Sequence, residues 1–233
     1  MIKRHSKSAI FMHWSNAVCW LFLLFSGFAI LENPLMQPVS ASWTELWNGV
    51  FGGAFNVLNA HVIVGLIWII LYACYLLFKL KSEALPFMQE VMHIEPKSDT
   101  IWCIRKGMRL TVGEKIMRKM GMETQLPPQG FYNAGQKFAA IAAVFCSIGL
   151  ALTGLVMFLM GGSEGAETII QWAMFIHFAC AGIMAVVLPI HIYMAALAPG
   201  EGPALRSMFT GFVPKAFAKM HNPLWYNKLN CKD

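Results

Sequence analysis

Charged residues are scarce in this sequence. Of its 233 residues, 13% are charged and 57% are hydrophobic, whereas a soluble domain carries about a quarter charged residues. The deficit is concentrated in long apolar runs. The composition therefore excludes an ordinary soluble globular domain and indicates that the chain lies in a bilayer.

Several chemical signatures are absent as well. The six cysteines are scattered singly, without a C-x-x-C pair, which excludes the usual zinc-ribbon, iron–sulfur and thioredoxin-like motifs. The lack of C-x-x-C-H excludes a c-type haem by that signature. The sequence also has no Gly-rich phosphate loop and no molybdenum-type site. Chemistry on a small substrate would therefore lie on a partner protein.

Four apolar segments have the length that a membrane span requires, about 20 residues. They cover residues 9–31, 55–78, 138–160 and 169–197. The first segment is too long for a signal peptide and no small-residue cleavage site follows it, so we expect it to remain as a helix. We predict an all-α integral membrane four-helix bundle, with residues 1–233 forming a single domain.

The distribution of lysine and arginine predicts the orientation. Three lie before the first span, ten in residues 79–137 and five in the tail 198–233, which together are all 18 in the chain. The other two loops, 32–54 and 161–168, carry only acidic charges: Glu32, Glu45, Glu164 and Glu167. The positive-inside rule then places both termini and residues 79–137 in the cytoplasm. The net charge of +6 reflects this topology and contact with anionic lipid, not nucleic-acid binding.

Three connecting stretches have the pattern of short interfacial helices. Trp43–Phe51 is predicted to be one, ended by Gly52-Gly53. Residues 101–120 read as a basic amphipathic helix, suited to the membrane surface or to a partner subunit. Residues 204–220 are another short basic amphipathic stretch, suited to the membrane surface.

Four of the seven histidines fall within the apolar segments, at His13, His61, His177 and His191. An ionisable residue at membrane depth is costly, so it is a functional hypothesis by default. A single such histidine is explained equally well by a hydrogen bond to a neighbouring helix. The arrangement of the four favours a cofactor.

Their spacing predicts two pairs at two depths. His177 and His191 are 14 residues apart, which separates them by about 21 Å along a helix but only about 40° around it. In the predicted topology His177 lies toward the outer side and His191 toward the inner side. His13 lies near the inner start of its span and His61 near the outer start of its span. We therefore predict that His13 pairs with His191 and His61 with His177.

Two imidazoles that face each other across a helix bundle are the axial ligands of a six-coordinate haem. The pattern predicts two b-type haems that carry electrons, because filled axial positions leave no site for substrate. Gly27, Gly65 and Gly182 lie where a flat macrocycle needs room, although small-residue helix packing is an alternative. Two histidines leave zinc short of ligands. A haem-free transporter with a histidine proton relay is the alternative of another class.

Several motifs occur in a characteristic order: Arg4-His5-Ser6, His13-Trp14, Asn16–Trp20, Tyr132–Lys137, and His177 with His191. In this order the sequence resembles, over most of its length, the cytochrome b (gamma) subunits of respiratory membrane-bound formate dehydrogenases. The resemblance implies that the iron of two b-type haems is bound by the same four histidines, in the same pairs: His13, His61, His177 and His191.

The resemblance also implies a quinone site beside the inner haem. Its residues fall on Asn133 and Gly135, with menaquinone or ubiquinone as the substrate, and Gln136 and Lys137 are candidates for quinone binding or proton delivery. An N-cap of the third span is the alternative role of Asn133. The implied partners are an iron–sulfur subunit and a catalytic dehydrogenase subunit in a bacterial cytoplasmic (inner) membrane.

These inferences predict an electron-transfer and quinone-reducing subunit that does not itself oxidise a small substrate. Electrons would pass from an outer-side iron–sulfur subunit through the two haems to a quinone at the cytoplasmic side. The cytoplasmic segment 79–137 is longer than the resemblance implies. The same module serving a hydrogenase or a sulfur-compound reductase therefore stays an alternative.

Overall fold

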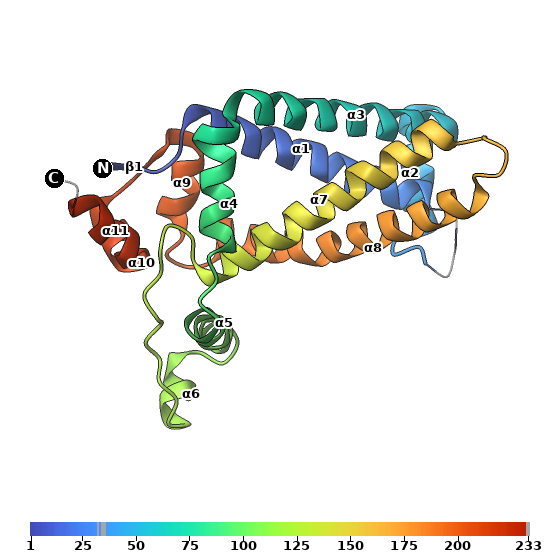
Figure 1. Cartoon of the computed structure of the whole chain (residues 1–233). Coiled ribbons are helices and arrows are strands. Elements are labelled where there is room, and N and C mark those ends of the chain that lie inside the picture. Colours follow the sequence, from blue (N-terminus) through green and yellow to red (C-terminus); the bar gives the residue numbers. More distant parts are fainter. Residues whose placement is uncertain (32, 34–35, 232–233) are drawn as a thin grey trace. The chain divides into compact units, whose positions relative to one another are not determined.

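The computed structural model describes residues 1–31, 33 and 36–231 (Figure 1). Glu32 and Lys232, two of the charged residues counted above, lie outside this range. The elements in chain order are β1 (Ile2–Lys3), α1 (Lys7–Ile30), α2 (Ala41–Phe51), α3 (Ala54–Lys79), η1 (Leu80–Ala84), α4 (Leu85–Met92), α5 (Pro96–Thr111), α6 (Glu114–Lys119), α7 (Ala134–Met160), α8 (Glu167–Ile192), η2 (Tyr193–Leu197), α9 (Gly202–Thr210), β2 (Phe212–Val213), α10 (Lys215–His221) and α11 (Pro223–Asn230).

Within the described residues, four helices are long and apolar enough to cross a membrane: Lys7–Ile30, Ala54–Met92, Ala134–Met160 and Glu167–Leu197. They confirm the predicted all-α membrane bundle. The second helix continues past the predicted span, through the π-helical turn η1 into α4, after the apolar run has ended at Lys79. The sidedness of the termini stays a prediction.

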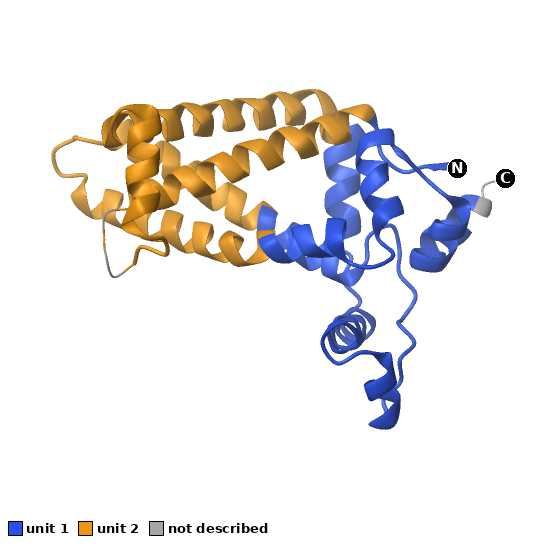
Figure 2. Cartoon of the chain, turned by 180° about the vertical axis from the view of Figure 1, so that it is seen from behind, with its two compact units in different colours: residues 1–6, 81–143, 189–233 blue, residues 7–80, 144–188 orange. Residues whose placement is uncertain are grey.

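The chain divides into two compact units (Figure 2). The first unit comprises residues 1–6, 81–143 and 189–233, and the second comprises residues 7–80 and 144–188. The second unit therefore contains most of the apolar helical length, and the first contains most of the charged connecting segments.

In the second unit, α1 and α3 pack side by side (Figure 1). The indole nitrogen of Trp68 on α3 donates a hydrogen bond of 2.8 Å to the amide oxygen of Asn16 on α1. Trp68 also lies edge-on to Trp20, with ring centroids 6.1 Å apart. On the outer surface, Leu77 and Phe78 are 77% and 76% exposed. Such exposed apolar surface is expected where lipid surrounds the protein.

The short helix predicted in the first loop is confirmed as α2. It ends because Gly52 adopts a φ of 76°, a left-handed conformation that glycine allows at a helix C-terminus. The amide of Gly53 then donates to the carbonyl of Asn48 at 2.8 Å. Trp47 of α2 packs edge-on against Phe22 of α1, with ring centroids 5.5 Å apart.

The first unit joins the N-terminus to the C-terminal tail. β1 and β2 pair antiparallel, with Ile2 opposite Val213. The Arg4 guanidinium donates to the Asn222 side chain at 2.9 Å and to the Phe131 carbonyl at 2.7 Å. It also lies 4.8 Å from the centre of the Phe131 ring, a cation–π contact. Arg4 therefore links three segments that are far apart in sequence.

The amphipathic helix predicted over residues 101–120 is divided, so that prediction was wrong. Residues 101–120 form α5 and α6, separated at Gly113, whose φ of +81° is incompatible with a right-handed helix. Residues 204–220 form α9, β2 and α10, with Gly211 at φ +83° between the first two. Both breaks result from a glycine inside an otherwise helical hydrophobic pattern.

The close approach of α7 to α8 at Gly149 in the second unit gives a test of the fold. A Cβ atom at Gly149 would lie 2.8 Å from the sulfur of Cys180. We expect Gly149→Ala to lower the free energy of unfolding by about 1–3 kcal/mol, measured in detergent as a lower unfolding midpoint.

Cys180→Ala should restore most of that loss in the double variant, because it removes the clashing sulfur. Gly49→Ala on α2 is the control, since no atom lies within 4 Å of its Cβ position. If Gly149→Ala were tolerated as well as Gly49→Ala, the close packing of these helices would be contradicted.

Candidate functional site

The structure brings His61 and His177 together in the second unit. His61 lies in the second turn of α3 and His177 lies on α8. Their ring centroids are 6.4 Å apart, and the ring planes are inclined at 59°. Two imidazoles from different helices thus face a common space between apolar helices.

Each ring is held through its Nδ1 atom by a hydroxyl group on another helix. Ser26 Oγ on α1 lies 2.8 Å from His61 Nδ1. Thr153 Oγ1 on α7 lies 2.9 Å from His177 Nδ1. Hydrogen bonds of this kind orient metal-binding histidines and fix which ring nitrogen carries the proton.

The hydroxyl groups determine the tautomer. Ser26 Oγ donates to the carbonyl of Phe22 at 2.7 Å, and Thr153 Oγ1 donates to the carbonyl of Gly149 at 2.6 Å. A hydroxyl has one hydrogen, so each oxygen accepts its second bond from the N–H of the histidine. This arrangement favours a proton on Nδ1 of both rings, which leaves the lone pair of Nε2 to bind a metal.

A glycine follows each of these hydroxyl residues. A Cβ atom at Gly27 would lie 3.5 Å from Cε1 of His61, and one at Gly154 would lie 3.6 Å from Cε1 of His177. Ser26-Gly27 and Thr153-Gly154 thus contact the two rings in the same way from α1 and α7. The sequence reasoning identified Gly27 but missed the other three residues, although a hydroxyl-Gly dipeptide occurs in both spans.

The other two predicted haem glycines have different surroundings. The Cβ position of Gly65 lies 3.9 Å from Cδ2 of Leu23, so α1 packs against it. The Cβ position of Gly182 has no atom within 4 Å. Gly65 is therefore explained by packing of α1 on α3, whereas Gly182 borders open space.

The His61–His177 geometry fits a metal bound between the rings. A metal–imidazole bond is about 2 Å long, and a ring nitrogen lies roughly 1 Å from its ring centroid. Two rings that bind one metal from opposite sides therefore have centroids about 6 Å apart. Within the part of the chain that the structure describes, no group of three or more His, Cys, Asp or Glu side chains is placed to hold a metal ion. Two axial ligands without a third are suited to a haem iron, whose other ligands come from the porphyrin.

The remaining two histidines belong to different units. His13 lies on α1 in the second unit, edge-on to Trp14 with ring centroids 5.3 Å apart. His191 lies in the last turn of α8, two residues after Pro189, in the first unit. The pairing of His13 with His191 therefore stays a prediction.

The first turn of α7 is capped by side chains in the first unit. Asn133 Oδ1 accepts from the amide of Gln136 at 2.9 Å, and Gln136 Oε1 accepts from the amide of Asn133 at 3.0 Å. This is a reciprocal capping box. Gln129 Oε1 also accepts from the amide of Ala134 at 2.6 Å. The N-cap alternative for Asn133 is therefore realised in the fold.

Gly135 and Tyr132 complete this turn. A Cβ atom at Gly135 would lie 3.3 Å from the ring of Trp102 on α5, so the missing side chain makes room for that indole. Burial raises the pKa of Tyr132 to about 12, although the neighbouring Arg4 acts in the opposite direction. The phenol is therefore a neutral donor at physiological pH, directly before Asn133.

A buried ion pair follows one turn later. Lys137 Nζ lies 3.0 Å from Asp99 Oδ2 and donates to the carbonyl of His93 at 2.8 Å. Asp99 is 2% exposed and Lys137 is 8% exposed. Sequence reasoning named Lys137 but missed Asp99, which lies 38 residues away in the chain.

Comparison with known proteins places this architecture in a family. The family model for prokaryotic cytochrome b561 matches residues 4–211. The chain is 24% identical, over 98% of its length and 93% of the relative's, to the cytochrome b556(fdo) subunit of formate dehydrogenase from Escherichia coli K12. It is 26% identical to the formate dehydrogenase cytochrome b556 subunit of Haemophilus influenzae, over 97% of this chain and 83% of that one.

The nitrate-inducible formate dehydrogenase cytochrome b556(Fdn) subunit of E. coli K12 is 23% identical, over 93% of this chain and 86% of that one. The family model covers well over half of the sequence and includes all four membrane histidines. The chain therefore belongs to the prokaryotic cytochrome b561 family.

Proposed function

We propose that this chain is the di-haem electron-transfer subunit of a formate dehydrogenase-type complex in a bacterial cytoplasmic membrane. It receives electrons from an iron–sulfur subunit on the outer side and delivers them to a quinone on the cytoplasmic side. The names of its relatives support the formate dehydrogenase partner. Oxidation of formate belongs to a separate catalytic subunit.

The observation that carries the proposal is the hydrogen bonding of the paired rings. Because Ser26 and Thr153 hold Nδ1–H of His61 and His177, both Nε2 atoms are available as axial ligands. A haem held by these two imidazoles would supply a one-electron carrier. The chain itself supplies the ring orientation, an apolar surrounding and the space beside Gly27 and Gly154.

The inner haem is assigned to His13 and His191. The spacing of His177 and His191 on the continuous helix α8 supports this assignment, because about four helical turns return a side chain to nearly the same face. Two haems at two depths divide electron transfer across the bilayer into short steps. Proton uptake on the cytoplasmic side, with oxidation outside, would then contribute to a proton-motive force.

The quinone is assigned to the start of α7. The amide oxygen of Asn133 is engaged in the helix cap, so its amide nitrogen is the group that would donate to a quinone carbonyl. Gly135 contributes indirectly, by allowing Trp102 to lie against the turn. Gln136 holds Asn133 in place through the capping box.

The partner surface on the outer side is assigned to α2. Trp43 donates through its indole nitrogen to the Phe25 carbonyl at 3.1 Å, so it is directed toward α1. The exposed face of α2 instead presents Leu46 and Val50, which are 57% and 71% exposed, beside the exposed acidic Glu45. This face is the proposed docking surface for the iron–sulfur subunit.

The proposal is tested on the purified membrane complex. We expect a reduced-minus-oxidised spectrum with a b-type α band, two haems per chain, and co-purifying iron–sulfur and dehydrogenase subunits that reduce quinone with formate. If a hydrogenase or sulfur-compound reductase subunit co-purified in their place, the chain would be assigned to that complex instead. A chain without haem would favour the histidine-relay transporter.

Single ligand variants test the outer pair. We expect His61→Ala and His177→Ala each to remove the same one of two haems, because a six-coordinate iron loses its site with either ligand. Haem content and the low-temperature α band measure the loss. The double variant should retain as much haem as either single variant. Complete loss of haem in the double variant would contradict the pairing, and so would full haem content in either single variant.

The hydroxyl groups give an independent test. We expect Ser26→Ala and Thr153→Val to weaken haem retention by about 10–100-fold, as for other partners of metal-binding histidines, and to shift the midpoint potential of one haem only. Redox titration followed at the α band measures this. Thr111→Val is the matched control, because its hydroxyl donates only within α5. A shift of equal size in the control would contradict the assigned role.

A further inference from the structure

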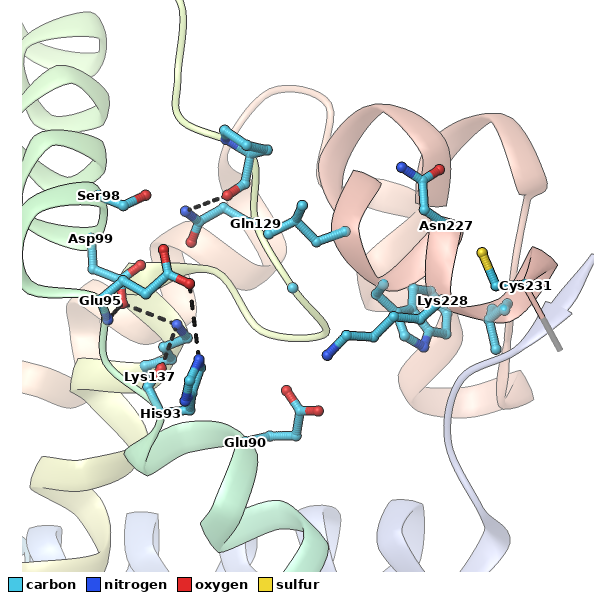
Figure 3. A pocket seen from close by; sticks show the side chains of 15 residues that line it. Glu90, His93, Glu95, Ser98, Asp99, Gln129, Lys137, Asn227, Lys228 and Cys231 are labelled. Atoms are coloured by element: carbon cyan, nitrogen blue, oxygen red, sulfur yellow. Dashed lines mark hydrogen bonds and ion pairs between the residues drawn. The ribbon is translucent and has the colours of Figure 1, made fainter.

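A cavity of about 750 Å³ lies in the first unit, beside the first turns of α5 and α7 (Figure 3). Its walls come from the end of α4, the start of α5, the segment before α7, and α11. Polar and charged side chains dominate the labelled lining: Glu90, His93, Glu95, Ser98, Asp99 and Lys137 (Figure 3). A space of this size beside several charged side chains holds water.

Two of the lining residues form the buried pair of Asp99 and Lys137. Both are almost fully buried, yet each also faces the cavity (Figure 3). Asp99 Oδ2 additionally accepts from the amide of Glu95 at 3.0 Å. Burying two opposite charges costs much of what their attraction returns, so such a pair is a weak contributor to stability. A role in moving charge explains its presence better.

The pair is connected to the proposed quinone residues through the same two helices. On α7, the amide of Lys137 donates to the carbonyl of Asn133 at 2.9 Å. On α5, Trp102 lies one turn after Asp99 and covers Gly135. α5 and α7 therefore place the ion pair in the wall of the cavity. Asn133 lies directly before the first residue of α7.

We propose that this cavity is the proton inlet of the quinone site, with Asp99 and Lys137 as the final proton carriers. The inference rests on the proposed function. Reduction of one quinone takes two electrons, delivered one at a time through the haems, and two protons. One O–H bond forms at each carbonyl oxygen. Each proton leaves Lys137 toward the quinone and is replaced through Asp99 from water in the cavity.

The groups around the pair are suited to collecting protons. Glu90, His93 and Glu95 line the cavity from the end of α4 and the start of α5. Lys228 lines it from α11, and Cys231 from the position directly after that helix. The side chains of His93 and Glu95 are 76% and 60% exposed, so they are in contact with bulk water.

The test uses the assembled complex. Asp99→Leu combined with Lys137→Met removes both charges together, so neither is left buried without its partner. We expect quinone reduction to fall about 100-fold, the scale of positioned proton transfer, with unchanged haem content and an unchanged rate of haem reduction by formate. Reduced haem should accumulate during turnover. Arg105→Met with Glu123→Leu, an exposed ion pair, is the matched control.

Two further variants separate proton transfer from a structural role. Ser98→Trp narrows the cavity without altering the pair, and should slow quinone reduction while increasing its solvent deuterium isotope effect. Asp99→Asn should regain activity with acetate, a weak acid small enough for the cavity, whereas the control variant should not respond.

The outcomes distinguish the inference from the function on which it rests. Normal quinone reduction in Ser98→Trp or in the double variant, with full haem content, would overturn the inlet. The inlet would also be overturned if acetate did not restore quinone reduction in Asp99→Asn and the slower quinone reduction of Ser98→Trp showed an unchanged solvent isotope effect. If the double variant fails to assemble, these two single variants decide. A wild-type complex without haem or quinone reduction would instead refute the proposed function.

Discussion

A bilayer interior offers no water to buried polar groups, so each of them must find a partner within the protein. In the described part of the chain, every buried side-chain nitrogen and oxygen has a hydrogen-bond partner. Ser26 shows the consequence. Its side chain is fully buried, and it donates to a carbonyl of its own helix while accepting from His61. Satisfying one hydroxyl thereby fixes the orientation and tautomer of an imidazole on another helix.

Thr153 repeats the arrangement with His177 from the other side of the space. Two helices therefore position each ring: one carries the histidine, and the other carries the hydroxyl and the adjacent glycine. A ligand that must be oriented in a low-dielectric interior needs this kind of support, because no solvent can replace a lost hydrogen bond. The proposed haem site is for this reason a property of four helices, although two of them supply no ligand.

The start of α7 follows the same rule where the helix begins. Its first amide groups lack partners within the helix, and Gln129, Asn133 and Gln136 supply acceptors for them or for their neighbours. The residues that the family resemblance assigns to quinone binding are thus also structural. This dual role explains why an ordinary N-cap and a binding residue cannot be distinguished by residue type alone. Lys137 lies on the same helix, one turn after Asn133, so the Asp99–Lys137 pair lies beside the proposed quinone site.

The sequence by itself determined the four spans and the short helix α2, because these depend on local composition. The depth of each membrane histidine, derived from the fixed rise of a helix, stays a prediction. The sequence did not predict the breaks at Gly113 and Gly211, since a glycine within a helical pattern either continues or ends the helix. Only the tertiary structure assigned Ser26 and Thr153 to the histidine rings and Asp99 to Lys137. Those contacts depend on how each helix is rotated about its axis and on which segments pack together, and packing across long sequence separations leaves no periodic signal in the chain.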